Sequence, residues 1–158
     1  MSIAIFPGTF DPSTLGHLDI IKRSVKIFGN LTIVVCASSS KKPLFTMEER
    51  VAMAKSCCAE YPEVKVVGYS GLLPDFIREH QVQVLVRGVR TVADYDYEMQ
   101  LTGMYRLAVP EVEIVMLPTN GNLSFISSTL VRDLINYRGD ITPFVPEVVA
   151  ASIKAKYY

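Results

Sequence analysis

The sequence predicts an α/β domain in which a parallel sheet lies between two layers of helices. Short apolar runs alternate five times with segments whose apolar residues recur at helical spacing along the 158 residues. The run at residues 31–36 is apolar on both faces, as a strand covered from both sides requires. Strands that alternate with helices are joined by crossover connections, so we expect the strands to be parallel.

Each expected strand is a short run rich in isoleucine, valine and leucine. These runs are residues 3–6, 31–36, 64–67, 82–86 and 114–117. Helices are expected where apolar residues recur on one face, at about residues 16–28, 46–60, 72–81, 97–108, 127–139 and 146–156. A capping box formed by Thr46 and Glu49 marks one helix start, and Gly29 and Gly139 mark two helix ends.

The order of the strands decides where a ligand would bind. Right-handed crossovers leave few windings, and we predict a Rossmann-like, doubly wound sheet in the order 3-2-1-4-5, with C-terminal helices, in one domain over residues 1–158. The switch point of that order lies between the first and fourth strands, and ligands bind beyond their carboxyl ends. The segments at residues 8–17 and 87–90 would therefore face one another across a crevice.

The composition excludes several classes of partner. Sixteen basic and sixteen acidic residues cancel, so the chain lacks the positive field of a general nucleic-acid binder, and no such partner is expected. The longest apolar run, residues 31–37, is too short to cross a bilayer, and no basic leader segment opens the chain. We therefore expect a soluble cytoplasmic protein without a membrane partner.

The three cysteines, Cys36, Cys57 and Cys58, form no Cys-x-x-Cys motif. Reduced, buried thiols are expected. A redox role for the adjacent pair is disfavoured, because neighbouring side chains on a helix point about 100° apart.

The loop at residues 6–17 has the composition of a phosphate site at a strand-to-helix junction. Gly8 lets bare backbone approach an anion, and Gly16 and His17 open a helix whose N–H groups and dipole attract phosphate. The loop matches neither a P-loop nor the Gly-x-Gly-x-x-Gly fingerprint. It suits an ATP-type ligand, with His17 donating to an α-phosphate oxygen and Thr9 binding phosphate.

Further cations and hydroxyls gather at other expected strand ends. Arg87 and Arg90 follow a buried strand, where planar guanidinium groups suit phosphates. Lys41 and Lys42 lie on the loop after the second strand, where a lysine pair is ordinarily solvated but where this loop would form the rim of the crevice. The hydroxyls of residues 127–129 can cap a helix and cradle a phosphate at the same position.

Other polar residues have structural interpretations. Asp11, before a proline, is expected to brace its loop, and His80 reads as an exposed cation at a helix end. Asp94, Asp96 and Glu98 lie early in a helix, where carboxylates are usually dipole partners. No metal site made by the protein is expected, and a divalent metal would arrive with the nucleotide.

Several stretches together resemble one protein family. Gly-Thr-Phe-Asp-Pro followed by Thr-x-Gly-His resembles the signature of the nucleotidylyltransferase superfamily. Over nearly its whole length the chain resembles the bacterial phosphopantetheine adenylyltransferases, through residues 7–12 with 16–17, 40–43, 86–90, 94–100 and 126–132.

This resemblance implies a reaction. AMP would pass from ATP to 4′-phosphopantetheine, giving dephospho-coenzyme A and pyrophosphate in coenzyme A biosynthesis. Attack at the α-phosphorus would be in line, and Mg²⁺ would bridge ATP oxygens with few protein ligands. A homohexamer is usual in the family and is expected here.

The resemblance also implies residue roles. It implies that the catalytic residues are His17, Lys41 and Arg90. The residues that it implies for ATP binding are Thr9, Phe10, His17, Gly88, Val89, Arg90, Glu98, Leu123, Ser124, Phe125, Ile126, Ser127, Ser128 and Thr129. Those that it implies for phosphopantetheine binding are Thr9, Lys41, Leu73 and Arg87.

Two other functions compete with this one. The first is a related transferase whose acceptor is nicotinate mononucleotide or an alcohol phosphate. The second is a non-catalytic nucleotide sensor of the same architecture, since fold alone does not fix function. The presence of His17 with Lys41 and Arg90 favours catalysis, because a sensor needs affinity but no stabilisation of the α-phosphate.

Overall fold

The computed structural model describes residues 3–38 and 42–158. Its strands are β1 (Ala4–Gly8), β2 (Leu31–Cys36), β3 (Val64–Tyr69), β4 (Val84–Val89) and β5 (Glu113–Pro118). Its helices are α1 (Leu15–Phe28), α2 (Met47–Cys57), α3 (Leu73–Glu79), α4 (Val92–Ala108), the 3-10 helix η1 (Gly121–Leu123), α5 (Ser128–Asn136) and α6 (Glu147–Tyr157).

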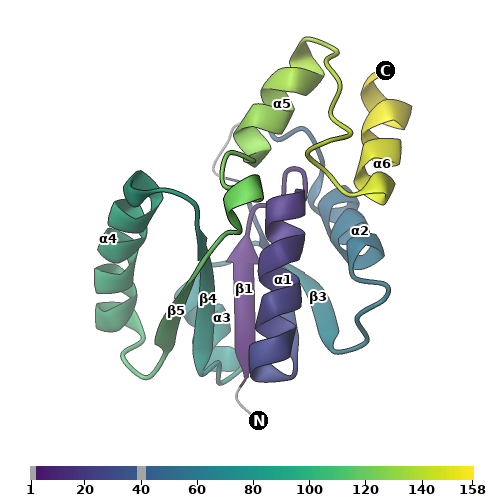
Figure 1. The fold of residues 1–158 in the computed structure, drawn as a ribbon. Helices are drawn as coiled ribbons and strands as arrows, with labels where there is room; N and C mark the ends of the chain where they lie inside the picture. The colour runs from purple at the N-terminus through teal and green to yellow at the C-terminus, as the bar shows by residue number, and fades with distance from the viewer. Residues whose placement is uncertain (1–2, 39–41) are drawn as a thin grey trace.

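The five strands form one parallel sheet in the order β3-β2-β1-β4-β5, which confirms the predicted winding. In its register Gly8 pairs with Val35 of β2, and Ile5 pairs with both Thr32 and Leu85 of the two flanking strands. All the carboxyl ends therefore meet at one edge of the sheet, the upper edge in Figure 1, where the turn into α1 and the segment leading to α5 also lie.

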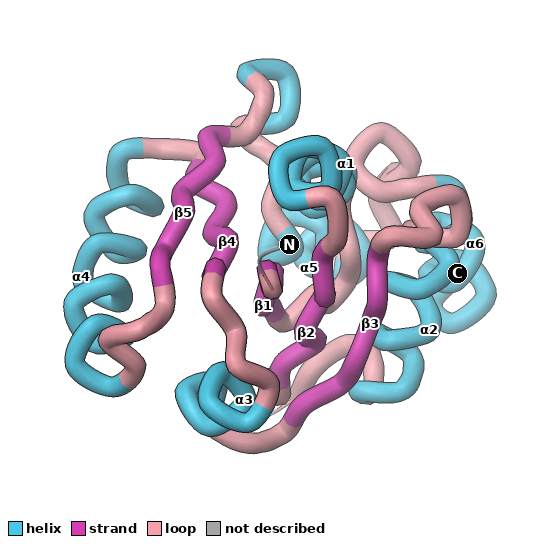
Figure 2. The backbone as a smooth tube through the Cα atoms, turned by 90° about the horizontal axis from the view of Figure 1, so that it is seen from below, coloured by secondary structure: helices cyan, strands magenta, loops and turns pink. Residues whose placement is uncertain are grey.

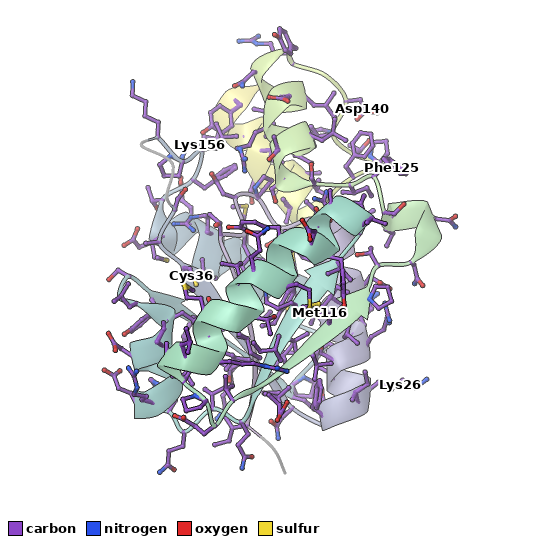
Figure 3. All side chains as sticks on the ribbon, turned by 90° about the vertical axis from the view of Figure 1, so that its left-hand side faces the viewer. Lys26, Cys36, Met116, Phe125, Asp140 and Lys156 are labelled. Atoms are coloured by element: carbon purple, nitrogen blue, oxygen red, sulfur yellow. The ribbon has the colours of Figure 1, made fainter. Side chains whose placement is uncertain are left out.

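Alternate residues of the strands build two apolar layers. Phe6, Ile33 and Val86 pack against α1 and α2, whereas their neighbours Ile5 and Val34 pack against α3 and α4 on the other face. Figure 2 shows α1 and α3 on opposite sides of the sheet, and in Figure 3 α4 crosses in front of it. Period-two alternation thus buries both faces, as a doubly wound sheet requires.

The C-terminal helices pack against the rest of the chain through a third apolar cluster. Val131 and Ile135 of α5 meet Val149 and Ile153 of α6, and Phe45 joins them from the segment before α2. This packing holds α5 above the carboxyl edge of the sheet (Figure 1), so its first turn points toward the end of β1.

Some element boundaries differ from the prediction. β4 continues to Val89 because Arg87, Gly88 and Val89 pair with β5, so Arg87 lies within the strand and not after it. Helix α4 begins earlier than expected, at Val92, because the Thr91 side chain caps it. The 3-10 helix η1 was not predicted.

The cysteine thiols are free in the structure, as predicted, but only Cys58 is buried; Cys36 and Cys57 are half-buried, contrary to the expectation. Burial raises the pKa of Cys57 to about 12 and that of Cys58 to about 11. Thiolate is the reactive form of cysteine, so these two side chains are poor nucleophiles near pH 7.

Candidate active site

A cavity of about 280 Å³ opens at the carboxyl edge of the sheet, between β1 and β4. This is the switch point at which doubly wound sheets bind ligands. The cavity is lined by Phe6, Pro7, Gly8, Thr14, Gly16, His17, Ile20, Arg87, Gly88, Arg90, Thr119, Ile126, Ser127, Ser128 and Thr129. Helices α1 and α5 both begin at it, so the N–H groups of two helix starts lie beside one space.

His17 is held at the start of α1 by reciprocal contacts with Thr14. The Thr14 backbone N–H donates to Nδ1 of His17 over 3.0 Å, and the His17 backbone N–H donates to the Thr14 hydroxyl over 3.3 Å. This is a capping box in which histidine stands where glutamate or glutamine is usual. A backbone N–H can only donate, so Nδ1 is the unprotonated nitrogen and Nε2 carries the hydrogen.

The surroundings of His17 keep its ring neutral. Burial, and secondarily the positive charge of Arg90, lower its pKa from 6.5 to about 4. Near pH 7 the ring is therefore a neutral donor through Nε2, on the wall of the cavity. In this form the ring offers one hydrogen-bond donor, Nε2–H, to a phosphate oxygen.

The ring of Phe10 packs against the imidazole of His17. Phe10 is 1% exposed, and its ring centroid lies 4.7 Å from that of His17. A Cβ added at Gly8 would lie 3.0 Å from the Phe10 ring, so a side chain at Gly8 would crowd the ring that carries the imidazole. The side chain of Phe10 thus faces the core and the histidine.

Arg90 joins the end of β4 to the loop before α5. Its guanidinium forms a two-point contact with Asp94, with nitrogen–oxygen distances of 3.0 and 3.3 Å, and donates to the carbonyl of Ile126 over 3.2 Å. The same loop meets the N-terminal turn, because Ser128 Oγ donates to the Pro12 carbonyl over 2.8 Å. Arg90 and the start of α5 thus lie at one cavity wall.

Arg87 forms a more deeply placed ion pair. Its Nε and one terminal nitrogen each lie 2.7 Å from an oxygen of Glu98, and the two side chains are 20% and 10% exposed. Burial alone would lower the pKa of Arg87, but the hydrogen bonds and charge of Glu98 raise it above its ordinary value. The second terminal nitrogen has no partner in the described part of the chain, which leaves its N–H groups for a ligand.

The structure brings together half of the residues that the sequence analysis selected. His17, Arg87, Gly88, Arg90, Ile126, Ser127, Ser128 and Thr129 line the cavity. Lys41 lies outside the described residues. The others are not among the residues that line the cavity: Thr9, Phe10, Leu73, Val89, Glu98, Leu123, Ser124 and Phe125.

The residues outside the cavity lining occupy distinct positions. Leu73 begins α3 and packs against the apolar layer of that face. Glu98 holds Arg87, and the Thr9 carbonyl accepts from Arg50. Phe125 is 61% exposed on the loop before α5.

Seven lining residues were not among the predicted site residues, although the sequence had already placed Gly8 and Gly16 in a phosphate-binding loop. Pro7, Thr14 and Gly16 lie inside the N-terminal motif, so their position beside Gly8 and His17 was a usable signal. Phe6 and Ile20 carry no polar group that would draw attention. Thr119 follows β5, and only the tertiary fold brings it to the cavity. The other lining residues lie on segments that the sequence had already singled out.

Among residues 3–38 and 42–158, no group of three or more His, Cys, Asp or Glu side chains is arranged to hold a metal ion. Within the same residues, no helix combines the length and apolarity needed to traverse a bilayer.

A doubly wound sheet whose switch-point cavity is lined by two arginines and two helix starts is typical of nucleotide-binding α/β proteins. Residues 5–134 match the family model described as cytidylyltransferase-like, and the chain belongs to that family, within the nucleotidylyltransferase superfamily. The chain is also 49% identical, over 152 residues, to the phosphopantetheine adenylyltransferase of Tolumonas auensis, a match that covers 96% of this chain and 93% of that protein. The resemblance seen in the sequence is thereby confirmed.

Proposed function

We propose that this protein is an adenylyltransferase that transfers AMP from ATP to 4′-phosphopantetheine, giving dephospho-coenzyme A and pyrophosphate. The main observation behind the proposal is that a neutral His17, with Nε2 as its donor nitrogen, lies on the wall of the cavity. The guanidinium groups of Arg87 and Arg90 line the same cavity. The similarity to a phosphopantetheine adenylyltransferase along nearly the whole chain supports the choice of substrates.

The chemistry is a displacement at the α-phosphorus of ATP. An oxygen of the acceptor phosphate forms the new P–O bond, and the bond between the α-phosphorus and the bridging oxygen breaks, releasing pyrophosphate. Because the attacking oxygen is already anionic near neutral pH, no general base is needed. Catalysis then consists of positioning the reactants and stabilising negative charge.

The residues divide between the two substrates. His17 donates to the α-phosphate as charge builds there, while Arg90 and the start of α5 at Ser127–Thr129 bind the phosphates of ATP. Residues 123–126 border the adenine. Arg87, whose position is fixed by Glu98, donates to the acceptor phosphate through its other terminal nitrogen.

The remaining proposed roles lie on the acceptor side. Lys41 and Thr9 orient the two phosphates toward one another, and Leu73 borders the uncharged pantetheine arm. Leu72, which is 71% exposed, extends this apolar border at the start of α3. An apolar border suits a flexible uncharged chain better than a second nucleotide.

Mg²⁺ fits this site as a companion of ATP. The cavity offers guanidinium, imidazole, hydroxyl and backbone groups, a donor set suited to phosphates and not to a protein-made metal cage. Arg90 and Ser127–Thr129 would hold the phosphates that carry the ion. When bound, Mg²⁺ would neutralise part of the charge on the departing pyrophosphate.

We also propose that the chain forms homo-oligomers, with the homohexamer of the resembled family as the expected state. Helix α4 exposes apolar side chains, among them Val92, which is 85% exposed, and Leu107, which is 89% exposed. Such a patch on one helix supports self-association. Light scattering of the purified chain measures the subunit number.

The test of the proposed function is release of pyrophosphate from ATP in the presence of different acceptors. Phosphopantetheine should support release, and nicotinate mononucleotide and alcohol phosphates should not. Strong activity with another acceptor would reassign the substrate within the superfamily. ATP binding without turnover on any acceptor would favour the sensor.

A further inference from the structure

Arg50 of α2 is a buried cation that binds backbone carbonyls from three segments. The residue is 2% exposed. Its Nε donates to the Phe45 carbonyl over 3.2 Å, and one terminal nitrogen donates to the carbonyls of Thr9 and Cys36 over 2.6 and 2.8 Å. It forms no ion pair within the described residues. A charge buried without a counter-charge is costly, so these hydrogen bonds have to hold it.

Two of these carbonyls lie where β1 and β2 end, so Arg50 links the two strands at that point. Thr9 directly follows β1 and Cys36 ends β2, and these strands are paired up to Gly8 and Val35. The guanidinium therefore continues the contact between β1 and β2 beyond the last paired residues. It lies at the carboxyl edge, where both strands enter the loops of the proposed site.

Asp11 fixes the far end of the segment that leaves β2. Its two carboxylate oxygens accept the backbone N–H groups of Leu44 and Phe45, each over 3.0 Å, and Asp11 is 2% exposed. Arg50 and Asp11 thus hold residues 36 and 44–45 against the loop that follows β1. Lys41, proposed to orient the acceptor phosphate, belongs to the segment between these two anchors.

We propose that Arg50 is a positioning residue for the acceptor half of the site, and this inference rests on the proposed function. It acts by fixing where residues 36 and 44–45 stand relative to residues 9–11, and not by touching either substrate. A guanidinium suits this task because its planar fork spreads donors over three nitrogens, whereas the donors of a lysine ammonium all lie on one atom.

The nucleotide half is held by different contacts, which makes the two halves separable. Asp19 of α1 accepts from the Asn120 side chain over 2.8 Å, and Arg23 donates to the Pro118 carbonyl over 2.6 Å. Arg90 holds the Ile126 carbonyl at the other end of the same loop. None of these contacts passes through Arg50.

The experiment compares Arg50→Lys with Asp19→Asn as a converse control. For Arg50→Lys, the KM for phosphopantetheine should rise about tenfold or more, the size expected when charged hydrogen bonds are lost, while the Kd for ATP stays within about twofold. Asp19→Asn should weaken ATP binding and leave the acceptor KM nearly unchanged. Equal effects of Arg50→Lys on both substrates, or an effect on thermal stability alone, would overturn the proposal.

Hydrogen exchange gives a readout that does not depend on the substrate. In Arg50→Lys, the amides of Leu44 and Phe45 should lose protection while those of residues 119–126 keep theirs. If Arg50→Lys does not fold, Asp11→Asn loosens the other anchor and should give the same kinetic split. Unchanged exchange at residues 44–45 would contradict the proposed role of Arg50 in positioning this segment. A wild-type protein inactive with phosphopantetheine would instead refute the proposed function.

Discussion

The backbone N–H of Thr14 lies 3.0 Å from Nδ1 of His17 and donates to it. One contact therefore serves two purposes. It satisfies an N–H at the start of α1, and it fixes the imidazole as the tautomer with its hydrogen on Nε2. The residue that caps the helix is thus also the residue that presents a neutral donor to the cavity.

The two roles of His17 can be separated by substitution. Glutamine at this position restores the usual capping box, so His17→Gln should keep the wild-type melting temperature. Its turnover should fall by about 10²–10³, because the Nε2–H of a rigid imidazole is lost and the flexible amide of glutamine does not hold a donor at the same position. His17→Ala should lose turnover to the same extent and in addition destabilise the fold by about 1 kcal/mol.

Steady-state kinetics and thermal unfolding measure these effects, with ATP affinity determined by calorimetry. ATP affinity should change little in His17→Gln. A glutamine variant with near-normal turnover would remove His17 from the catalytic role, and a collapse of ATP binding would make it a ground-state binding group.

The lowered pKa of His17 predicts how stability depends on pH. The folded pKa is about 4 and the ordinary value is 6.5, so between these values the unfolded chain binds a proton that the folded chain does not. The free energy of unfolding keeps its full value above pH 6.5 and falls as the pH drops toward 4, because protonation then stabilises the unfolded chain. By pH 5 this loss of stability should reach about 2 kcal/mol, judged from that shift.

Urea unfolding of the wild type and His17→Gln at pH 7 and pH 5 measures this loss. The variant should lose less stability than the wild type over this interval. Nitrogen NMR of the imidazoles gives a direct check, because His80 is the only other histidine. Parallel stability curves, or a His17 that titrates near pH 6.5, would contradict the assigned environment.

The strand order and much of the cavity could be predicted because they follow from local pattern. Alternating strands and helices with right-handed crossovers leave few windings, and the segments that follow the first and fourth strands carry His17 and Arg90. The contacts that hold the site could not be predicted. Arg50 stands in a charged stretch that reads as a solvated helix start, and its partner Thr9 is 41 residues away. Such contacts depend on tertiary packing alone.

The ion pair between Arg87 and Glu98 should be important for stability. Because both side chains are mostly buried, Glu98→Ala leaves an uncompensated cation and should cost about 3–5 kcal/mol. The matched control is Asp75→Ala, which breaks a pair with Arg78 whose side chains are both 51% exposed and should cost at most about 1 kcal/mol.

Denaturant unfolding compares these variants. The double variant Arg87→Met with Glu98→Leu should recover much of the stability lost in Glu98→Ala, because an apolar pair replaces the buried charges. Similar costs for Glu98→Ala and Asp75→Ala would show that the Arg87 pair is effectively solvated.

Arg90 should require its guanidinium group as well as its charge. Arg90→Lys keeps the net charge but cannot hold Asp94 at two points while also reaching the Ile126 carbonyl. The loop before α5 should lose its anchor, and ATP affinity measured by calorimetry should weaken. Unchanged ATP affinity would mean that a point charge suffices at this position.

The reverse reaction tests the central claim most directly, since it needs both the acceptor identity and the chemistry at the α-phosphorus. Purified protein incubated with dephospho-coenzyme A, pyrophosphate and Mg²⁺ should form ATP and phosphopantetheine in equal amounts, and His17→Gln should do so about 10²–10³ times more slowly. Failure of the wild type to form ATP from dephospho-coenzyme A would contradict the account.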